Sequence, residues 1–373
     1  GELLVEGSRN TAVGAYALSQ ENAHGRNTAV GYSALTAATG GGSNYNTAVG
    51  YDAGKALAGN SNSNVAIGTF AMDAATENDR NVAIGYNALG DADDGEDGNV
   101  AIGYGAMSAV NHADNDYNVI IGFEAGTGGN GGTLNYNIAI GNLALNSTDT
   151  ASVNEVVAIG REACTALSSA DAAGTVAIGS FALAELTSGR YNTAIGWASQ
   201  YNGQDIGNKN TSVGYSSLYS LNPDGDGEGQ NTCVGAYCGD GITTGVQNTG
   251  LGSDVAFDID ADNQTAIGYG AGSGSKGANS VVLGNGSVTN VYMADDEGAK
   301  VWCTNIDSSS DARIKKNVKE ITIGLDFVNE LNPVTFNMRK AEDWDEDLKK
   351  KQDWYKKNKT PRDIDDEEKK IGF

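Results

Sequence analysis

The chain has 373 residues, of which 52 are glycine and only 3 are proline, and its formal net charge at pH 7 is −24. This charge argues against a nucleic-acid binder, which needs a cationic surface to displace the counterions of the phosphates. The absence of an apolar run of about 18 residues predicts no membrane span. The two histidines and four cysteines show no metal-ligand spacing, so we expect neither a metal ion nor a cofactor.

Residues 1–288 are dominated by a repeat of the form Asn-[Thr/Val]-Ala-[Val/Ile]-Gly, as at residues 27–31 and 64–68. So short a period, with one β-branched run in each copy, predicts a mostly β fold, a parallel β-solenoid. In each copy we expect a three-residue strand, a bend at the glycine and a short second element such as residues 32–35. The sixteen motif glycines recur on average every 18 residues and are Gly14, Gly31, Gly50, Gly68, Gly85, Gly103, Gly122, Gly141, Gly160, Gly179, Gly196, Gly214, Gly235, Gly252, Gly268 and Gly284.

Asparagine precedes the strand in 12 of the 16 copies. Its side chain is suited either to bond the local backbone at a turn or to stack as an amide ladder from coil to coil. The joining segments are polar and vary in length, so they place a changeable surface on one side of a constant scaffold. Because a coil of this size has a thin interior and apolar residues on both strand faces, we expect several chains to associate along the long axis.

The repeats resemble the head repeats of trimeric autotransporter adhesins, and the same style of repeat occurs in bacteriophage tail fibres. The resemblance covers residues 10 to about 288. It implies a left-handed parallel β-roll of 16 coils, assembled as a homotrimer. The loops here are longer than those of the adhesin repeats.

The composition changes after the repeats. Residues 289–307 are expected to form a neck or linker. Residues 311–373 carry 15 of the 24 basic and 15 of the 48 acidic side chains, and they hold only two glycines, which indicates a second domain over residues 308–373. Residues 308–321, Ser-Ser-Ser-Asp-Ala-Arg-Ile-Lys-Lys-Asn-Val-Lys-Glu-Ile, resemble the start of the endosialidase-type C-terminal intramolecular chaperone, a self-cleaving serine peptidase domain of phage tail proteins. The resemblance implies a small α+β domain, of which we expect only the N-terminal part here.

That resemblance also assigns two catalytic residues. Ser310 matches the nucleophile and Lys315 the general base, so the scissile bond is expected between Ser309 and Ser310. A serine hydroxyl needs a base beside it. A lysine serves as that base only when it is neutral, a state that the nearby cations Arg313 and Lys316 would favour. Beyond this single cut in each chain we expect no enzyme turnover.

Three other patterns have two interpretations each. Acidic clusters at residues 91–97, 224–228 and 258–262 suit Ca²⁺, but they form no complete EF-hand loop and are interpreted as solvated loops. Cys233 and Cys238 can bridge only if the fold brings them together. Aromatic residues after many motif glycines are suited to stack on sugars, although a packing ladder is the preferred interpretation. These aromatic residues are Tyr32, Tyr51, Tyr86, Tyr104, Phe123, Trp197, Tyr215 and Tyr269.

Together these features predict a homotrimeric phage tail fibre in the virion, whose shaft binds a host cell-surface glycan or protein receptor and which contacts other tail proteins. One alternative is a bacterial trimeric surface adhesin, which would end in an outer-membrane anchor and lack the Ser-Lys element. A second is a polysaccharide-degrading tailspike, which needs a defined pair of carboxylates that the acidic loops do not single out. An ice-binding solenoid is disfavoured, because Thr gives way to Val at the first strand position in the middle copies.

Overall fold

The computed structural model describes residues 8–291, apart from 21–24, 39–42, 93–94, 111, 113, 129–131, 147–151, 168–171, 204–206, 223–228, 261 and 273–275, together with residues 346, 349 and 350. The chain divides into two compact units, Gly1–Tyr292 and Met293–Phe373. The strands of the described residues all lie in the first unit.

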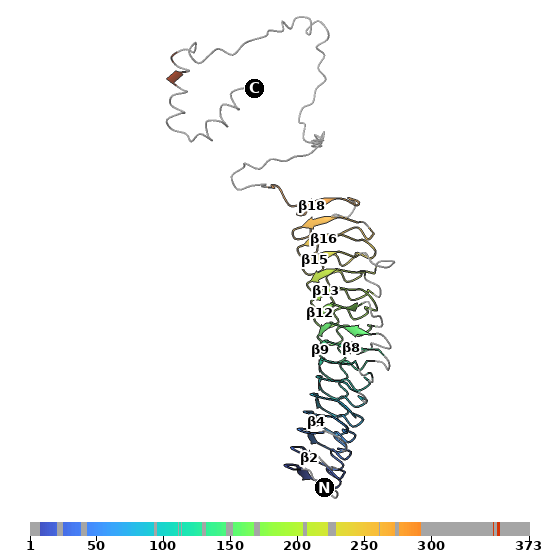
Figure 1. The fold of residues 1–373 in the computed structure, drawn as a ribbon. Helices are drawn as coiled ribbons and strands as arrows, with labels where there is room; N and C mark the ends of the chain where they lie inside the picture. Colours follow the sequence, from blue (N-terminus) through green and yellow to red (C-terminus); the bar gives the residue numbers. More distant parts are fainter. Residues whose placement is uncertain are drawn as a thin grey trace. The chain divides into compact units, whose positions relative to one another are not determined.

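The first unit is a parallel β-solenoid in which each motif supplies one short strand, and the strands stack in sequence order (Figure 1). This arrangement confirms the solenoid predicted from the repeat. A sheet of sixteen strands runs along the unit, and a second sheet pairs only β8 (Leu134–Asn135) with β10 (Val153–Asn154). The strands of the large sheet are β1 (Thr11–Val13), β2 (Thr28–Val30), β3 (Thr47–Val49), β4 (Val65–Ile67), β5 (Val82–Ile84), β6 (Val100–Ile102), β7 (Val119–Ile121), β9 (Ile138–Ile140), β11 (Val157–Ile159), β12 (Val176–Ile178), β13 (Thr193–Ile195), β14 (Thr211–Val213), β15 (Thr232–Val234), β16 (Thr249–Leu251), β17 (Thr265–Ile267) and β18 (Val281–Leu283).

In the strands between β1 and β18 the side chains alternate between the interior and the outside. In β5 the middle residue, Ala83, is fully buried, whereas Val82 and Ile84 on either side of it are partly exposed. The branched residues favour the extended backbone, and the small alanine fits a thin interior. Residues beyond the motif glycine complete that interior, as Ala88 and Leu89 do after β5.

The second element of each copy is a turn rather than a strand. Asn87 and Leu89 both have a left-handed backbone, with φ of 51°. Their N–H groups still bond from coil to coil, because Asn87 donates to the carbonyl oxygen of Thr69 at 3.0 Å and Leu89 to that of Ala106 at 2.9 Å. A left-handed backbone is unfavourable for residues other than glycine. These intercoil hydrogen bonds and the burial of the leucine offset that cost.

The motif glycines mark the line along which successive coils approach most closely. All sixteen have a positive φ, between 78° and 151°. At Gly122 an added Cβ atom would lie less than 3.0 Å from the carbonyl oxygen of Gly141 in the next coil. Both the backbone conformation and the available space therefore require glycine at this position.

Gly122→Ala should lower the free energy of unfolding by at least about 2 kcal/mol, because it combines left-handed strain with a backbone clash. Gly241→Ala is the matched control, since a Cβ atom there would meet nothing within 4 Å. Thermal unfolding followed by circular dichroism measures both variants. Equal melting temperatures for the two would contradict the close approach of the coils.

Candidate functional site

The motif asparagines form a buried ladder along the solenoid. Of the two roles that the sequence suggested for them, a bond to the local backbone at a turn or an amide ladder from coil to coil, the structure shows the ladder. The side-chain Oδ1 of Asn99 accepts the backbone N–H of Asn118 in the next coil at 2.9 Å, and its Nδ2 donates to the carbonyl oxygen of Asn115 at 2.6 Å. Asn99 is fully buried, so this pairing satisfies groups that water cannot reach. N–H groups that bond the asparagine of the preceding coil belong to Asn27, Asn46, Asn64, Asn81, Asn99, Asn118, Asn137, Val156, Asn210, Asn231, Asn248 and Gln264.

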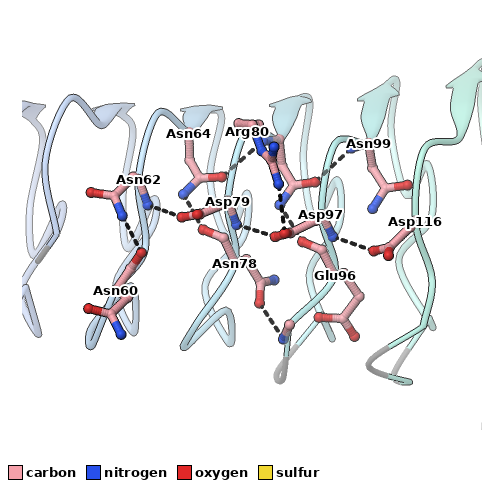
Figure 2. A network of polar contacts seen from close by, with 12 residues as sticks. Asn60, Asn62, Asn64, Asn78, Asp79, Arg80, Glu96, Asp97, Asn99 and Asp116 are labelled. Carbon is pink, nitrogen blue, oxygen red and sulfur yellow. Dashed lines mark hydrogen bonds and ion pairs between the residues drawn. The ribbon is translucent and has the colours of Figure 1, made fainter.

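A second set of stacked side chains, here called the polar column, lies three residues before the first residue of each strand concerned (Figure 2). Its hydrogen bonds run in the opposite direction, because the N–H of one coil donates to the side chain of the next. Asp79 N–H donates to Asp97 Oδ1 at 2.6 Å, and Asp97 N–H donates to Asp116 Oδ1 at 2.8 Å. The column consists of Asn44, Asn62, Asp79, Asp97, Asp116, Asn135 and Asn154.

The interpretation of residues 91–97 as a solvated acidic loop is wrong for Glu96 and Asp97. Glu96 is fully buried, and its Oε1 accepts the N–H of His112 at 3.2 Å. Asp97 belongs to the polar column and pairs with Arg80 at 3.0 Å. In the part of the chain that the structure describes, no group of three or more His, Cys, Asp or Glu residues could hold a metal ion, and residues 224–228 lie outside that part. The two acids therefore link coils by accepting backbone hydrogen bonds.

Three successive members of the polar column carry a negative charge. Asp79, Asp97 and Asp116 belong to consecutive coils, which places them about 5 Å apart along the stack. Desolvation raises the pKa of Asp116, the hydrogen bond from the N–H of Asp97 lowers it, and the charge of Asp97 raises it. The net shift is upward, so the folded chain holds this proton more tightly than the unfolded chain does. Ionisation of Asp116 therefore destabilises the fold as the pH rises through this range.

Asp116→Asn should raise the melting temperature at pH 7 by roughly 1–3 °C, because asparagine keeps the accepting oxygen and removes the repelled charge. Asparagine already occupies the same position at Asn62 and Asn135. The gain should shrink as the pH falls into the acidic range, where the carboxyl of the wild type takes up its proton. Asp260→Asn, at an exposed aspartate, controls for the loss of one negative charge. A gain independent of pH, or an equal gain in the control, would contradict the assignment.

Seven of the eight aromatic residues that follow the motif glycines pack against a neighbouring ring, which confirms the packing-ladder interpretation for them, whereas Tyr269 is 70% exposed and belongs to neither ladder. The ring centroids of Tyr86 and Tyr104 lie 5.0 Å apart, those of Tyr104 and Phe123 lie 5.3 Å apart, and both interplanar angles are 11°. Ring faces covered in this way are not open to stack on a sugar. One ladder contains Tyr16, Tyr32, Tyr51, Phe70, Tyr86, Tyr104 and Phe123, and another contains Phe181, Trp197, Tyr215 and Tyr237.

The outer surface of the large sheet, here called the strand face, consists of the first and third residues of its sixteen strands. Each of these residues is Thr, Val, Ile or Leu, so the face carries no charge. Val13, Leu251 and Val281 on it are 57%, 51% and 70% exposed. A continuous uncharged face of branched side chains, on a chain with a net charge of −24, is the mark of an interaction surface.

The residues assigned to peptide cleavage lie outside the described part of the chain. This holds for Ser309, Ser310 and Lys315, and equally for Arg313 and Lys316. Within the described residues, no helix has the length and apolar character needed to cross a membrane. Among the described residues, the strand face is the candidate interaction surface.

Comparison with known families matches residues 310–373 to the family model described as chaperone of endosialidase. No curated protein matches the chain. The match begins at Ser310 and includes residues 310–321 of the segment that resembles this chaperone. The chain thus joins a parallel β-solenoid to a C-terminal segment that is similar to the chaperone of endosialidase.

Proposed function

We propose that this chain is a subunit of a homotrimeric fibre of the phage tail type, in which the solenoid is the shaft and the C-terminal segment guides assembly. One observation carries the proposal: an uncharged strand face that runs the length of the solenoid occurs in the same chain as a segment similar to the chaperone of endosialidase. Chaperone segments of that type imply the formation of a trimer. The strand face supplies the surface along which three chains can meet.

The strand face requires a partner with a matching axial repeat. Its columns of branched side chains recur once in every coil, in strict register from β5 to β6 and onward. A partner that covers the face along its whole length must repeat at the same distance, and a second copy of this chain does so. Since the face has no charged side chain, covering it desolvates no charge. Three copies around one axis bury the strand face of each chain against the other two.

The repeat also explains why such a shaft would need a chaperone. Successive coils present nearly the same residues on the strand face, so a slip of one coil between chains preserves most of the contacts. The shaft alone therefore specifies the register of the three chains weakly. A C-terminal segment that first holds the chains side by side would set the register before the coils close. Its later removal would make unfolding of the fibre effectively irreversible.

We further propose that this segment cuts its own chain once. Neutral Lys315 accepts the hydroxyl proton of Ser310, and Ser310 Oγ attacks the carbonyl carbon of Ser309. The Ser309–Ser310 C–N bond breaks as its nitrogen takes up a proton, which leaves an ester between Ser309 and Ser310 Oγ. Water then hydrolyses this ester, so the freed piece begins at Ser310. The support is the position of the family match, which starts at Ser310 and includes Lys315. This Ser-Lys element favours a virion fibre over a bacterial surface adhesin.

The joining turns are the surface that we assign to a host-cell receptor. In Figure 2 the turn at Asn60 lies on the side of the coil away from the strands. If the strand faces meet at a common axis, these turns point outward from the fibre. They are polar and differ in sequence from coil to coil, as a surface that recognises a host glycan or protein requires.

The trimer predicts a specific effect of charge on the strand face. Sedimentation equilibrium should give the mass of three chains for the wild type. Ile102→Lys places one charge from each chain at the same level of the shared face, and should weaken association at least about tenfold. Asn60→Lys adds the same charge in an exposed turn and should leave the trimer intact. A monomeric wild type, or equal behaviour of the two variants, would contradict the shared face.

Cleavage is tested on the product of the whole gene. The wild type should give two fragments, the second with Ser310 at its N-terminus by terminal sequencing. Ser310→Ala and Lys315→Ala should each leave a single uncut chain that still forms trimers. Ser308→Ala is the control and should be cut normally. Normal cleavage of Lys315→Ala would refute the assignment of the base.

A further inference from the structure

Cys233 and Cys238 lie in one coil, and both are fully buried in the interior of the solenoid. Cys233 is the middle residue of β15, and Cys238 follows the motif glycine of that coil by three residues. A Cβ atom on Gly250 of the next coil would lie 2.5 Å from Cys238 Sγ and 3.1 Å from Cys233 Sγ. The two sulfurs are therefore no more than 5.6 Å apart, the sum of those distances. The fold thus brings the two cysteines together, which is the condition for a bridge between them.

The pair replaces two alanines that face each other in most other coils. In the coil of β6 the corresponding residues are Ala101 and Ala106, both fully buried. Two thiols need more room than two methyl groups, and Gly250 provides it, because the equivalent middle residue of most other strands is alanine. Cys233, Cys238 and Gly250 thus all differ from the alanine found in most other coils, and together they make room for two sulfurs in contact.

The closed coil favours the protonated form of Cys233. A hydrogen bond to Cys238 and burial raise the pKa of Cys233 well above its ordinary value. Since the thiolate is the species that attacks a disulfide, the folded coil reacts slowly. We therefore expect the two cysteines to be oxidised during folding, before the coil closes over their sulfurs.

We propose that Cys233 and Cys238 are a modification site, at which a disulfide forms within one coil when the chain folds in the presence of a small-molecule disulfide such as oxidised glutathione. The two thiols lose two protons and two electrons and form one S–S bond. The small-molecule disulfide accepts them, its own S–S bond breaks, and two thiols are released. The product ties β15 covalently to the turn that follows it, so this coil cannot open without breaking the bond.

The test is refolding of the purified chain in a glutathione redox buffer, compared with refolding in reductant. The proteins are unfolded without reductant, alkylated and digested with trypsin. Cys233 and Cys238 share the tryptic peptide 210–276, which contains no other cysteine. After oxidative refolding this peptide should carry no alkyl group and should be about 2 Da lighter than the reduced peptide, the mass of two hydrogen atoms. Two alkyl groups on it after oxidative refolding would overturn the proposal.

Cys164 is the internal control, because it is also fully buried and burial raises its pKa to about 12, but it lies in a different coil. It should be alkylated after either treatment. A melting comparison separates a native bond from one that merely forms between nearby cysteines of the unfolded chain. The oxidised wild type should melt at a higher temperature than the reduced one, and the two treatments should give the same melting temperature for the double variant Cys233→Ala, Cys238→Ala, which restores the alanine pair. An oxidised wild type that melts at or below the reduced temperature would show that the fold does not accommodate the bond.

Discussion

Hydrogen bonds directed along the axis, from each coil to the next, are the interaction on which the rest of this structure depends. The strands supply some of them, the left-handed turns supply others, and the stacked Asn side chains supply a third set. All of them require that equivalent atoms of successive coils lie at the same short distance. The glycine line enforces that distance, because at Gly122 the backbone of the next coil occupies the space of a side chain. A change of a single coil is therefore transmitted to both of its neighbours.

This constraint separates the surfaces of the solenoid by chemistry. Most side chains that point inward are alanine or leucine, with a smaller number of other apolar residues and polar groups that bond backbone, since the interior is narrow. Side chains on the strand face are limited to branched residues, which the strands favour. Charged side chains therefore lie mainly in the turns and in the polar column. There the carboxylates of Asp79, Asp97 and Asp116 accept hydrogen bonds, although their negative charges repel one another. The uncharged face that remains is the basis of the proposed trimer.

The repeat made the strands and their parallel stacking predictable, because a β-branched run and a glycine recur together sixteen times. The repeat did not predict the left-handed turns. Residues such as Asn87 and Leu89 have a positive φ there, although a positive φ is expected mainly of glycine. The polar column was missed for a different reason. Its members are Asn in some coils and Asp in others, and only the three-dimensional register shows that Asp97 and Asn135 occupy equivalent positions. The contact of Cys233 with Cys238 likewise depends on how one coil closes on itself, which spacing alone does not fix.

The central claim is that three solenoids meet through their strand faces. Electron cryomicroscopy of the shaft in cross-section tests it most directly. The account predicts three coils around a threefold axis, with the large sheets facing the axis and the joining turns at the periphery. A single isolated solenoid, or an assembly with the joining turns at its axis and the strand faces in solvent, would contradict it.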